Sequence, residues 1–258
     1  MMKLWLKVRS RCQRDASRLF ARRLARITPS PAIVSFTFDD FPRSALHEAG
    51  AILRSFGYLG TYYASFGLMG QIAPTGPIFS REDLTEFVHQ GHELGCHTFD
   101  HCHSWNTPSR VFEDSVLRNK RAVQELLPGT GLHSLSYPIS GPRPQTKRDT
   151  AKYFCCARGG GQTFNAGATD LNFLKAFFIE QSRDDFAAIK QVIEANARAH
   201  GWLIFATHDV CESPTRFGCS PGLFRQIVEC AAKSGAVVLP VHQAWQRIQS
   251  QSPAPGRL

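Results

Sequence analysis

Three strand-like segments of this chain end in carboxylate or imidazole side chains. Asp39 and Asp40 follow a short apolar run, His97 follows the short segment 93–96, and His208 follows the strongly apolar residues 202–207. Apolar runs of this length, bounded by polar residues, are typical of buried strands. If the strands are parallel, their carboxyl ends lie at one end of the sheet. Side chains that are far apart in the sequence would then meet at one place.

Strand-like and helix-like segments alternate along the chain. Apolar and β-branched runs predict strands at residues 33–38, 59–63, 93–96, 134–137, 153–157, 172–179, 202–207 and 236–241. Helical spacing and capping residues predict helices at residues 44–56, 80–91, 107–127, 185–199, 220–235 and 242–249. The glycine-rich stretch 159–170 is expected to be a loop.

Alternating strands and helices indicate an α/β fold with a parallel sheet covered by helices. Polar residues follow or end five separate strands, and this distribution favours a (β/α) barrel over an open sheet with a single crevice. We therefore expect one domain of seven or eight β/α units over residues 31–250. Residues 1–30 would form a basic N-terminal extension and residues 251–258 a loose tail.

The net charge of +9 is concentrated at the N-terminus. Residues 1–26 contain nine Lys or Arg and one acid, a balance of 9 − 1 = +8, and the other residues contain 21 basic and 20 acidic side chains, a balance of +1. The body is therefore nearly neutral, and we expect no nucleic-acid partner.

The basic segment has apolar residues at helical spacing. One interpretation is an amphipathic helix on anionic lipid, and the other is an extension that packs on the domain or is partly disordered. Residues 1–26 lack the apolar core of a secretory signal. The eight cysteines form no CxxC pair. We expect a reduced, cytoplasmic protein, and under the first interpretation residues 1–26 would also contact the inner face of the membrane.

A metal site is predicted from His97 and His101, which are four residues apart. On a helical turn this spacing points both imidazoles the same way. With one carboxylate of the Asp39–Asp40 pair they form a set that suits Zn²⁺ and leaves a position open for water. His103 is an alternative to His101.

The remaining carboxylate and His208 have two interpretations each. The free aspartate is either a general base beside the metal-bound water or part of a turn ahead of Pro42. His208 is either a structural residue bonded to a carbonyl or a proton donor that faces the site.

Four motifs occur in order along residues 31–250: TFDD at 37–40, HTFDH at 97–101, YPISG at 137–141 and HD at 208–209. The second motif follows GHELG at residues 91–95. Together they make the chain resemble the polysaccharide deacetylases of carbohydrate esterase family four, which include the nodulation-type chitooligosaccharide deacetylases.

The resemblance implies a distorted (β/α) barrel and a role for each motif residue. It implies that a divalent metal, most suitably Zn²⁺, is held by Asp40, His97 and His101. It implies that Asp39 is the general base, that His208 is the general acid, and that the backbone N–H of Tyr137 binds the oxyanion.

The reaction implied is removal of N-acetyl groups from an acetylated amino sugar in an oligosaccharide or polysaccharide, so the partner is an acetylated glycan. One alternative is a related hydrolase of an O-acetyl sugar or another non-peptide C–N bond. An alternative of another class is an inactive glycan-binding or scaffold protein.

The chain departs from the family pattern at three places. The arginine that supports the base is missing from the third motif, and Arg158 or Arg143 could replace it. Ala206 stands where many members have a leucine that lines the acyl pocket, which implies a roomier pocket. The residue that orients His208 is unclear, and the candidates in order are Asp170, Asp184 and Asp185.

Overall fold

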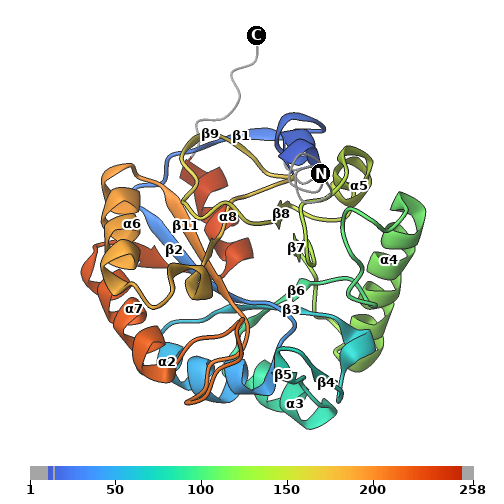
Figure 1. Ribbon diagram of the computed structural model, residues 1–258, viewed down its shortest axis with the longest axis horizontal. Coiled ribbons are helices and arrows are strands. Elements are labelled where there is room, and N and C mark those ends of the chain that lie inside the picture. The colour runs from blue at the N-terminus through green and yellow to red at the C-terminus, as the bar shows by residue number, and fades with distance from the viewer. Residues whose placement is uncertain (1–10, 14, 252–258) are drawn as a thin grey trace, which may run out of the picture.

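The computed structural model describes residues 11–13 and 15–251, and Figure 1 shows helices arranged around an inner set of strands. The main sheet contains eight strands: β2 (Ile33–Phe38), β3 (Thr61–Ala64), β6 (Glu93–Cys96), β7 (Ser134–Ser136), β8 (Cys156–Arg158), β10 (Phe177–Phe178), β11 (Trp202–Thr207) and β12 (Val237–Val238). The strand order is β10–β11–β2–β3–β6–β7–β8, with β12 beside β2, and every pair is parallel.

An irregular segment continues the curl of the sheet between its two ends. Ala157 in β8 donates its N–H to Leu171 and accepts from Leu174, both at 2.8 Å. The chain then reaches β10, which pairs with β11 at the opposite end of the strand order. This arrangement confirms the predicted single-domain, distorted (β/α) barrel.

Most of the helices lie outside the strands (Figure 1). The helical elements are η1 (Ala45–Ala49, a π-helix), α2 (Gly50–Ser55), η2 (Phe66–Leu68), α3 (Arg81–Gln90), α4 (Ser109–Leu126), α5 (Pro144–Thr150), η3 (Ile179–Ser182), α6 (Phe186–Arg198), α7 (Pro221–Lys233) and α8 (Val241–Gln251). Two small antiparallel pairs complete the fold: β1 (Leu24–Ile27) with β9 (Gly167–Asp170), and β4 (Ile72–Ala73) with β5 (Gly76–Pro77).

Local signals set the ends of α3 as predicted. Ser80 Oγ accepts from the N–H of Asp83, and the Asp83 carboxylate accepts from the N–H of Ser80, which completes a capping box. Gly91 ends the helix in the left-handed conformation with φ 76°. By contrast, Ser44 does not cap the preceding helix, predicted at residues 44–56, because its hydroxyl accepts from the N–H of Val210 at 3.3 Å.

Three predictions of secondary structure were wrong. Residues 167–170 form β9 instead of a loop, because they pair with β1 far away in the sequence. The predicted strand at 153–157 is displaced to Cys156–Arg158, and most of the predicted strand at 172–179 is irregular, with β10 only two residues long. Helix α5 was not predicted.

The N-terminal extension packs on the domain from Ser17 onward, as the second interpretation expected. The buried Ser17 hydroxyl donates to the carbonyl of Pro142 at 2.6 Å, and Arg23 Nη2 donates to the carbonyl of Cys155 at 2.6 Å. The buried Lys147 ammonium donates to the carbonyls of Ser17 and Phe20. The helical spacing predicted for residues 1–10 and the predicted loose end at 252–258 lie outside the described residues.

No helix in the described part of the chain is both long enough and apolar enough to cross a membrane.

Two adjacent strands, β2 and β11, form the centre of the core. Every residue of both strands is buried, and their registers pair Phe36 with Phe205. The two rings stack with centroids 5.5 Å apart. Burial on both faces fixes these strands, and therefore fixes the positions at which Asp39 and His208 leave the sheet.

Glu93, the first residue of β6, generates a prediction about pH and stability. Its carboxylate accepts from the N–H of His242 at 2.8 Å and from the Thr61 hydroxyl at 3.1 Å, which attaches α8 to the N-terminal ends of β3 and β6. Burial nevertheless raises the pKa of Glu93 to about 7. A raised carboxyl pKa means that the folded state binds the proton more tightly, so ionisation weakens folding as pH rises from about 4.5 to about 7.

We predict that Glu93→Gln removes this pH dependence, which amounts to at most about 3 kcal/mol. The measurement is urea unfolding of both proteins across this pH range. The stability of the variant relative to the wild type should rise with pH, whatever its absolute value. A constant difference would show that Glu93 does not titrate in this range.

Candidate active site and metal centre

Five strands of the parallel sheet deliver the predicted site residues to one end of the barrel. Asp39 and Asp40 follow β2, His97 follows β6, Tyr137 follows β7 and His208 follows β11, while Arg158 is the last residue of β8. The parallel registers place all of these carboxyl ends at the same end of the sheet.

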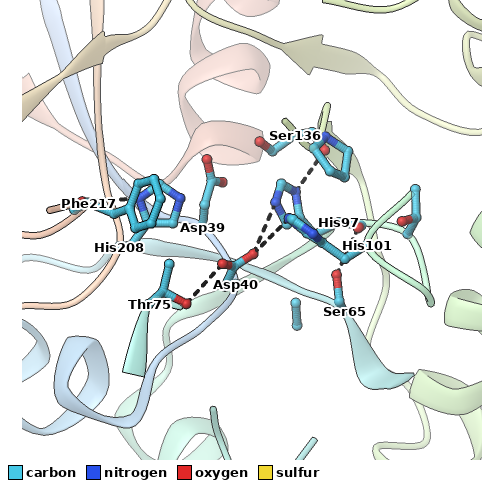
Figure 2. Close-up of polar contacts among 12 residues, drawn as sticks. Asp39, Asp40, Ser65, Thr75, His97, His101, Ser136, His208 and Phe217 are labelled. Carbon is cyan, nitrogen blue, oxygen red and sulfur yellow. Dashed lines mark hydrogen bonds and ion pairs between the residues drawn. The ribbon is translucent and has the colours of Figure 1, made fainter. Parts of the chain in front are cut away.

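The structure brings the three predicted metal ligands together. Asp40 Oδ1 lies 3.4 Å from His97 Nε2 and 3.1 Å from His101 Nε2, and the three ligand atoms lie within 4.8 Å of one another (Figure 2). Within residues 11–13 and 15–251, Asp40 Oδ1 is a buried oxygen without a hydrogen-bond partner. One carboxylate oxygen and two imidazole nitrogens that converge in this way fit a tetrahedral Zn²⁺ site with a fourth position open.

The backbone turns sharply at two of these ligands. Asp40 has φ 63° and His101 has φ 52°, both in the left-handed region that non-glycine residues rarely adopt. Such conformations cost on the order of 1–3 kcal/mol each and persist where the surrounding structure imposes them. The turn at Asp40 lets two consecutive carboxylates make different contacts, with Asp40 directed to the histidines and Asp39 directed to Arg158.

A second layer of hydrogen bonds orients two of the three ligands, Asp40 and His97 (Figure 2). The Thr75 hydroxyl donates to Asp40 Oδ2 at 3.0 Å, which leaves Oδ1 to face the imidazoles. His97 Nδ1–H donates to the carbonyl of Ser136 at 2.9 Å, so its Nε2 keeps a lone pair on the side of Asp40. The Ser65 hydroxyl donates to the carbonyl of His97 at 2.8 Å and holds the backbone there.

The protonation states suit metal ligation. Burial lowers the pKa of His97 to about 4, so this imidazole is neutral near pH 7. Burial opposes ionisation of Asp40, but the close contact with His101 and the charges of the nearby imidazoles lower the pKa of Asp40 overall. The same contact raises the pKa of His101, against the effect of its burial. A neutral imidazole and an ionised carboxylate are the forms that bind metal.

Arg158 holds the second carboxylate. Its Nη2 donates to Asp39 Oδ1 at 2.6 Å, and its guanidinium lies 4.7 Å from the ring centre of Tyr63. Burial raises the pKa of Asp39, but the charges of Arg158, His97 and His208 together outweigh that effect, so the pKa lies below its ordinary value. Of the two arginines predicted as candidates, Arg158 therefore contacts Asp39, whereas Arg143 donates to the carbonyls of Trp105 and Asn106.

His208 lies beside Asp39 and Asp40 (Figure 2), and its charge contributes to lowering the pKa of both carboxyls. Its Nδ1–H donates to the carbonyl of Phe217 at 3.1 Å. The loop that contains Phe217 is held by Thr215, whose N–H and hydroxyl both donate to the Asp209 carboxylate.

The prediction that a carboxylate orients His208 needs correction. Asp170 accepts from Lys147 Nζ at 2.6 Å and from the N–H of Arg23 at 2.9 Å, because its strand lies against the N-terminal extension. Asp185 caps α6 by accepting from the N–H of Ala188. A backbone carbonyl, that of Phe217, takes the orienting position at His208 Nδ1.

The predicted oxyanion donor also needs correction. The N–H of Tyr137 donates to the carbonyl of Arg158 at 3.0 Å, which continues the β7–β8 pairing by one residue. The Tyr137 side chain is buried, and its hydroxyl contacts Thr150. This N–H is therefore committed to the sheet and is not free for a substrate oxygen.

Two site residues were missed at the sequence level. Thr75 lies in the turn between β4 and β5, where nothing in its neighbourhood signals a contact with Asp40. Glu180 follows β10, and its Oε2 is buried without a hydrogen-bond partner in the described chain, as are Nε and Nη1 of Arg158. Burial raises the pKa of Glu180 to about 8, and the Asp39 charge adds to that increase. No local sequence pattern would have identified either residue.

His103, the alternative ligand, is placed elsewhere. Its Nδ1 accepts from the N–H groups of Trp105 and Asn106, both at 3.3 Å, and contacts the Ser140 hydroxyl. The three-residue group in the described chain contains His101 instead.

Comparisons with known proteins agree with the motifs. The sequence profile of a family described as polysaccharide deacetylase matches residues 26–154, half of the 258 residues. A search of curated protein sequences gives no match.

Several solved structures share the fold at low sequence identity. One is the Xyl-CE4 domain of a multidomain xylanase from the hindgut metagenome of Trinervitermes trinervoides, at 15% identity and a TM-score of 0.59, with 87% of this chain and 94% of that chain covered. A family 4 acetyl xylan esterase from Clostridium thermocellum, in complex with a cobalt ion, has 18% identity and a TM-score of 0.57, with coverages of 83% and 90%.

A third similar structure is a CE4 family pseudoenzyme from Bacillus anthracis, at 11% identity and a TM-score of 0.57, with 84% of this chain and 66% of that chain covered. The fold therefore occurs with and without activity, so the function has to be argued from the site residues.

Thr75 generates a prediction about metal affinity. We predict that Thr75→Val lowers affinity for Zn²⁺ by about 10–100-fold, because Asp40 loses the donor that orients it. Isothermal titration of metal-free protein with Zn²⁺ measures this change. The control is Thr85→Val, at an exposed position on α3, which should bind as the wild type does. Equal affinity in both variants would contradict the role of Thr75.

Proposed function

Since the chain belongs to the polysaccharide deacetylase family, we propose that it is a metal-dependent hydrolase that removes N-acetyl groups from an acetylated amino sugar of an oligosaccharide or polysaccharide. The observation that carries the proposal is the convergence of Asp40, His97 and His101 beside a second buried carboxylate, Asp39. If Asp39 and Asp40 only formed a turn ahead of Pro42, no arginine would be needed to hold the Asp39 carboxylate apart from that of Asp40.

Zn²⁺ is the metal we propose, because two imidazoles and one carboxylate suit it. A similar structure from the family contains a cobalt ion, which accepts comparable ligands. When bound, the metal would polarise the acetyl carbonyl and lower the pKa of a water molecule that it holds.

Asp39 is proposed as the general base. The charges of Arg158, His97 and His208 keep this carboxylate ionised, and Arg158 fixes one of its oxygens at 2.6 Å, so the other is available to accept the proton of the attacking water. A group that transfers a proton in this way typically contributes ~10²–10⁴-fold to the rate.

His208 is proposed as the general acid. The hydrogen bond from Nδ1–H to Phe217 leaves Nε2 as the nitrogen that can deliver a proton. An amine is a poor leaving group unless it is protonated as the C–N bond breaks, and His208 would supply that proton. The tetrahedral oxygen would not be bound by the Tyr137 N–H, which is committed to the sheet.

A second candidate is hydrolysis of an O-acetyl sugar. One similar structure is an acetyl xylan esterase, and Ala206 replaces the larger residue that many family members have near the acyl group. An alcohol leaves more easily than an amine, so ester cleavage would depend less on His208. Comparing kcat/KM for N-acetylglucosamine oligomers and for acetylated xylan decides between the two. A higher value for the oligomers favours N-deacetylation, and a higher value for the xylan favours ester hydrolysis.

We also propose a reducing, cytoplasmic environment. All eight cysteines, which lie within the described residues, are free thiols, and Cys155 and Cys156 form a hydrogen bond between their sulfurs at 3.9 Å instead of a disulfide. Mass spectrometry of protein alkylated directly from cells would count the free thiols.

The first prediction from this function concerns the metal. Purified protein loaded with Zn²⁺ should retain about one ion per chain and release acetate from N-acetylglucosamine oligomers. His97→Ala should lose the ion. Its activity should fall by more than roughly 100-fold, which is the upper effect of removing only a group that hydrogen-bonds a metal ligand. His103→Ala is the matched control from the same loop and should keep the metal. Retention of metal and activity by His97→Ala would reject the proposed centre.

The second prediction separates base from ligand. Asp39→Asn should lower kcat by ~10²–10⁴-fold while zinc content stays near that of the wild type, because Asp39 is held by Arg158 and is not one of the three converging ligands. Zinc content is read by plasma emission and kcat from acetate release. Loss of metal together with activity would mean that Asp39 is a ligand. A metal-loaded wild type that binds oligosaccharide without any turnover would favour the glycan-binding alternative.

A further inference from the structure

The described part of the N-terminal extension exposes large apolar side chains in a cluster. Leu19, Phe20 and Leu24 are 65%, 59% and 57% exposed. The other large apolar side chains that the described chain exposes to this degree are dispersed, at residues 72, 88, 111 and 139. Single exposed apolar residues are ordinary, but three within six residues indicate a contact surface.

Arginines alternate with these apolar residues. Arg18, Arg22 and Arg26 are exposed in the same stretch, and its apolar and basic residues together define what we call the Arg–Leu surface: Arg18, Leu19, Phe20, Arg22, Leu24 and Arg26. The stretch 18–26 contains no acid. The surface therefore combines positive charge with exposed hydrocarbon.

The body of the protein holds this surface in place. Lys147 donates to the carbonyls of Ser17 and Phe20, and β1 pairs with β9 from residue 24 onward. Leu24 and Arg26 also line a hollow of about 490 Å³ together with Gly167. Hydrogen bonds of the backbone thus fix the segment, while its apolar side chains are left exposed to solvent instead of packing on the core.

The combination discriminates between kinds of partner. A nucleic acid would be bound by the cations, but it would gain little from exposed leucines. An anionic lipid bilayer matches both features, since its phosphates attract arginines and its acyl boundary accepts apolar side chains.

We propose that the Arg–Leu surface docks on an anionic lipid bilayer. Leu19, Phe20 and Leu24 enter the boundary between headgroups and acyl chains, and the three arginines contact lipid phosphates. Ser17, next to this surface, contacts Pro142, which follows β7 at the same end of the sheet as the metal centre. A glycan attached to a lipid would then lie near the site, a consequence that rests on the proposed function, whereas the docking itself does not.

Vesicle sedimentation with the full chain tests this proposal. We expect binding to vesicles of equal parts phosphatidylcholine and phosphatidylglycerol, little binding to phosphatidylcholine alone, and weaker binding as salt is raised. The triple change Arg18→Gln, Arg22→Gln and Arg26→Gln should weaken binding by about 100-fold, since each surface cation near anionic lipid contributes roughly 1 kcal/mol. The triple change Leu19→Ser, Phe20→Ser and Leu24→Ser should weaken it by at least about 10-fold.

Matched triples elsewhere on the surface serve as controls. Ile72→Ser, Val88→Ser and Val111→Ser remove three comparably exposed apolar side chains, and Arg54→Gln, Lys190→Gln and Arg198→Gln remove three exposed cations. Both control triples should bind as the wild type does. Circular dichroism checks that each variant folds. If a triple variant does not fold, the single change Phe20→Ser or Arg22→Gln replaces it, with a smaller expected loss of vesicle binding.

The proposal is overturned if the wild type does not bind the mixed vesicles, if it binds neutral vesicles equally, if the test and control triples bind alike, or if a DNA duplex displaces the vesicles. Acetate release from a soluble oligosaccharide is measured in parallel. Activity without vesicle binding rejects the docking surface alone, and vesicle binding without activity rejects the proposed reaction alone.

Discussion

A buried carboxylate oxygen without a hydrogen-bond partner faces two imidazole nitrogens, and the surrounding fold maintains this arrangement. Oδ1 of Asp40 lies 3.1 Å from His101 Nε2 and 3.4 Å from His97 Nε2. An unpaired buried carboxylate is unfavourable unless a cation or a donor satisfies it. Thr75 orients Asp40 and the carbonyl of Ser136 orients His97, while the central strands β2 and β11 fix the places where Asp39 and His208 leave the sheet. The proposed chemistry depends on this single convergence.

The division of work between the two consecutive aspartates follows from the same constraint. The left-handed turn at Asp40 sends one carboxylate to the histidines and leaves the other to Arg158. Arg158 comes from β8, so the partner of the proposed base is supplied by a strand that is far from β2 both in the sequence and in the strand order. In the described part of this site, Nε and Nη1 of Arg158 and Oε2 of Glu180 are also buried without a hydrogen-bond partner.

Features that depend on local sequence were predictable. The bounds of β2 and β11 follow from largely apolar runs, and those of α3 follow from the Ser80–Asp83 capping box and Gly91. The grouping of Asp40, His97 and His101 was predictable as well, because parallel strands place their carboxyl ends together. The errors concern non-local pairing. Tyr137 lost its predicted role because the β7–β8 ladder extends by one residue, and Asp170 lost its role because β9 pairs with the N-terminal extension. Neither the register between distant strands nor the contact of Thr75 with Asp40 leaves a signal in the local sequence.

X-ray absorption at the zinc edge of the loaded protein tests the central claim most directly, because it reports the atoms around the ion. The account predicts two imidazole nitrogens and oxygen ligands at ~2.0–2.2 Å, with no sulfur in the first shell. It also predicts that the imidazole signal is halved in His101→Ala protein that still holds metal at high zinc concentration. A shell with sulfur at ~2.3 Å, or an unchanged imidazole signal in that variant, would contradict the account by placing the metal elsewhere in the chain.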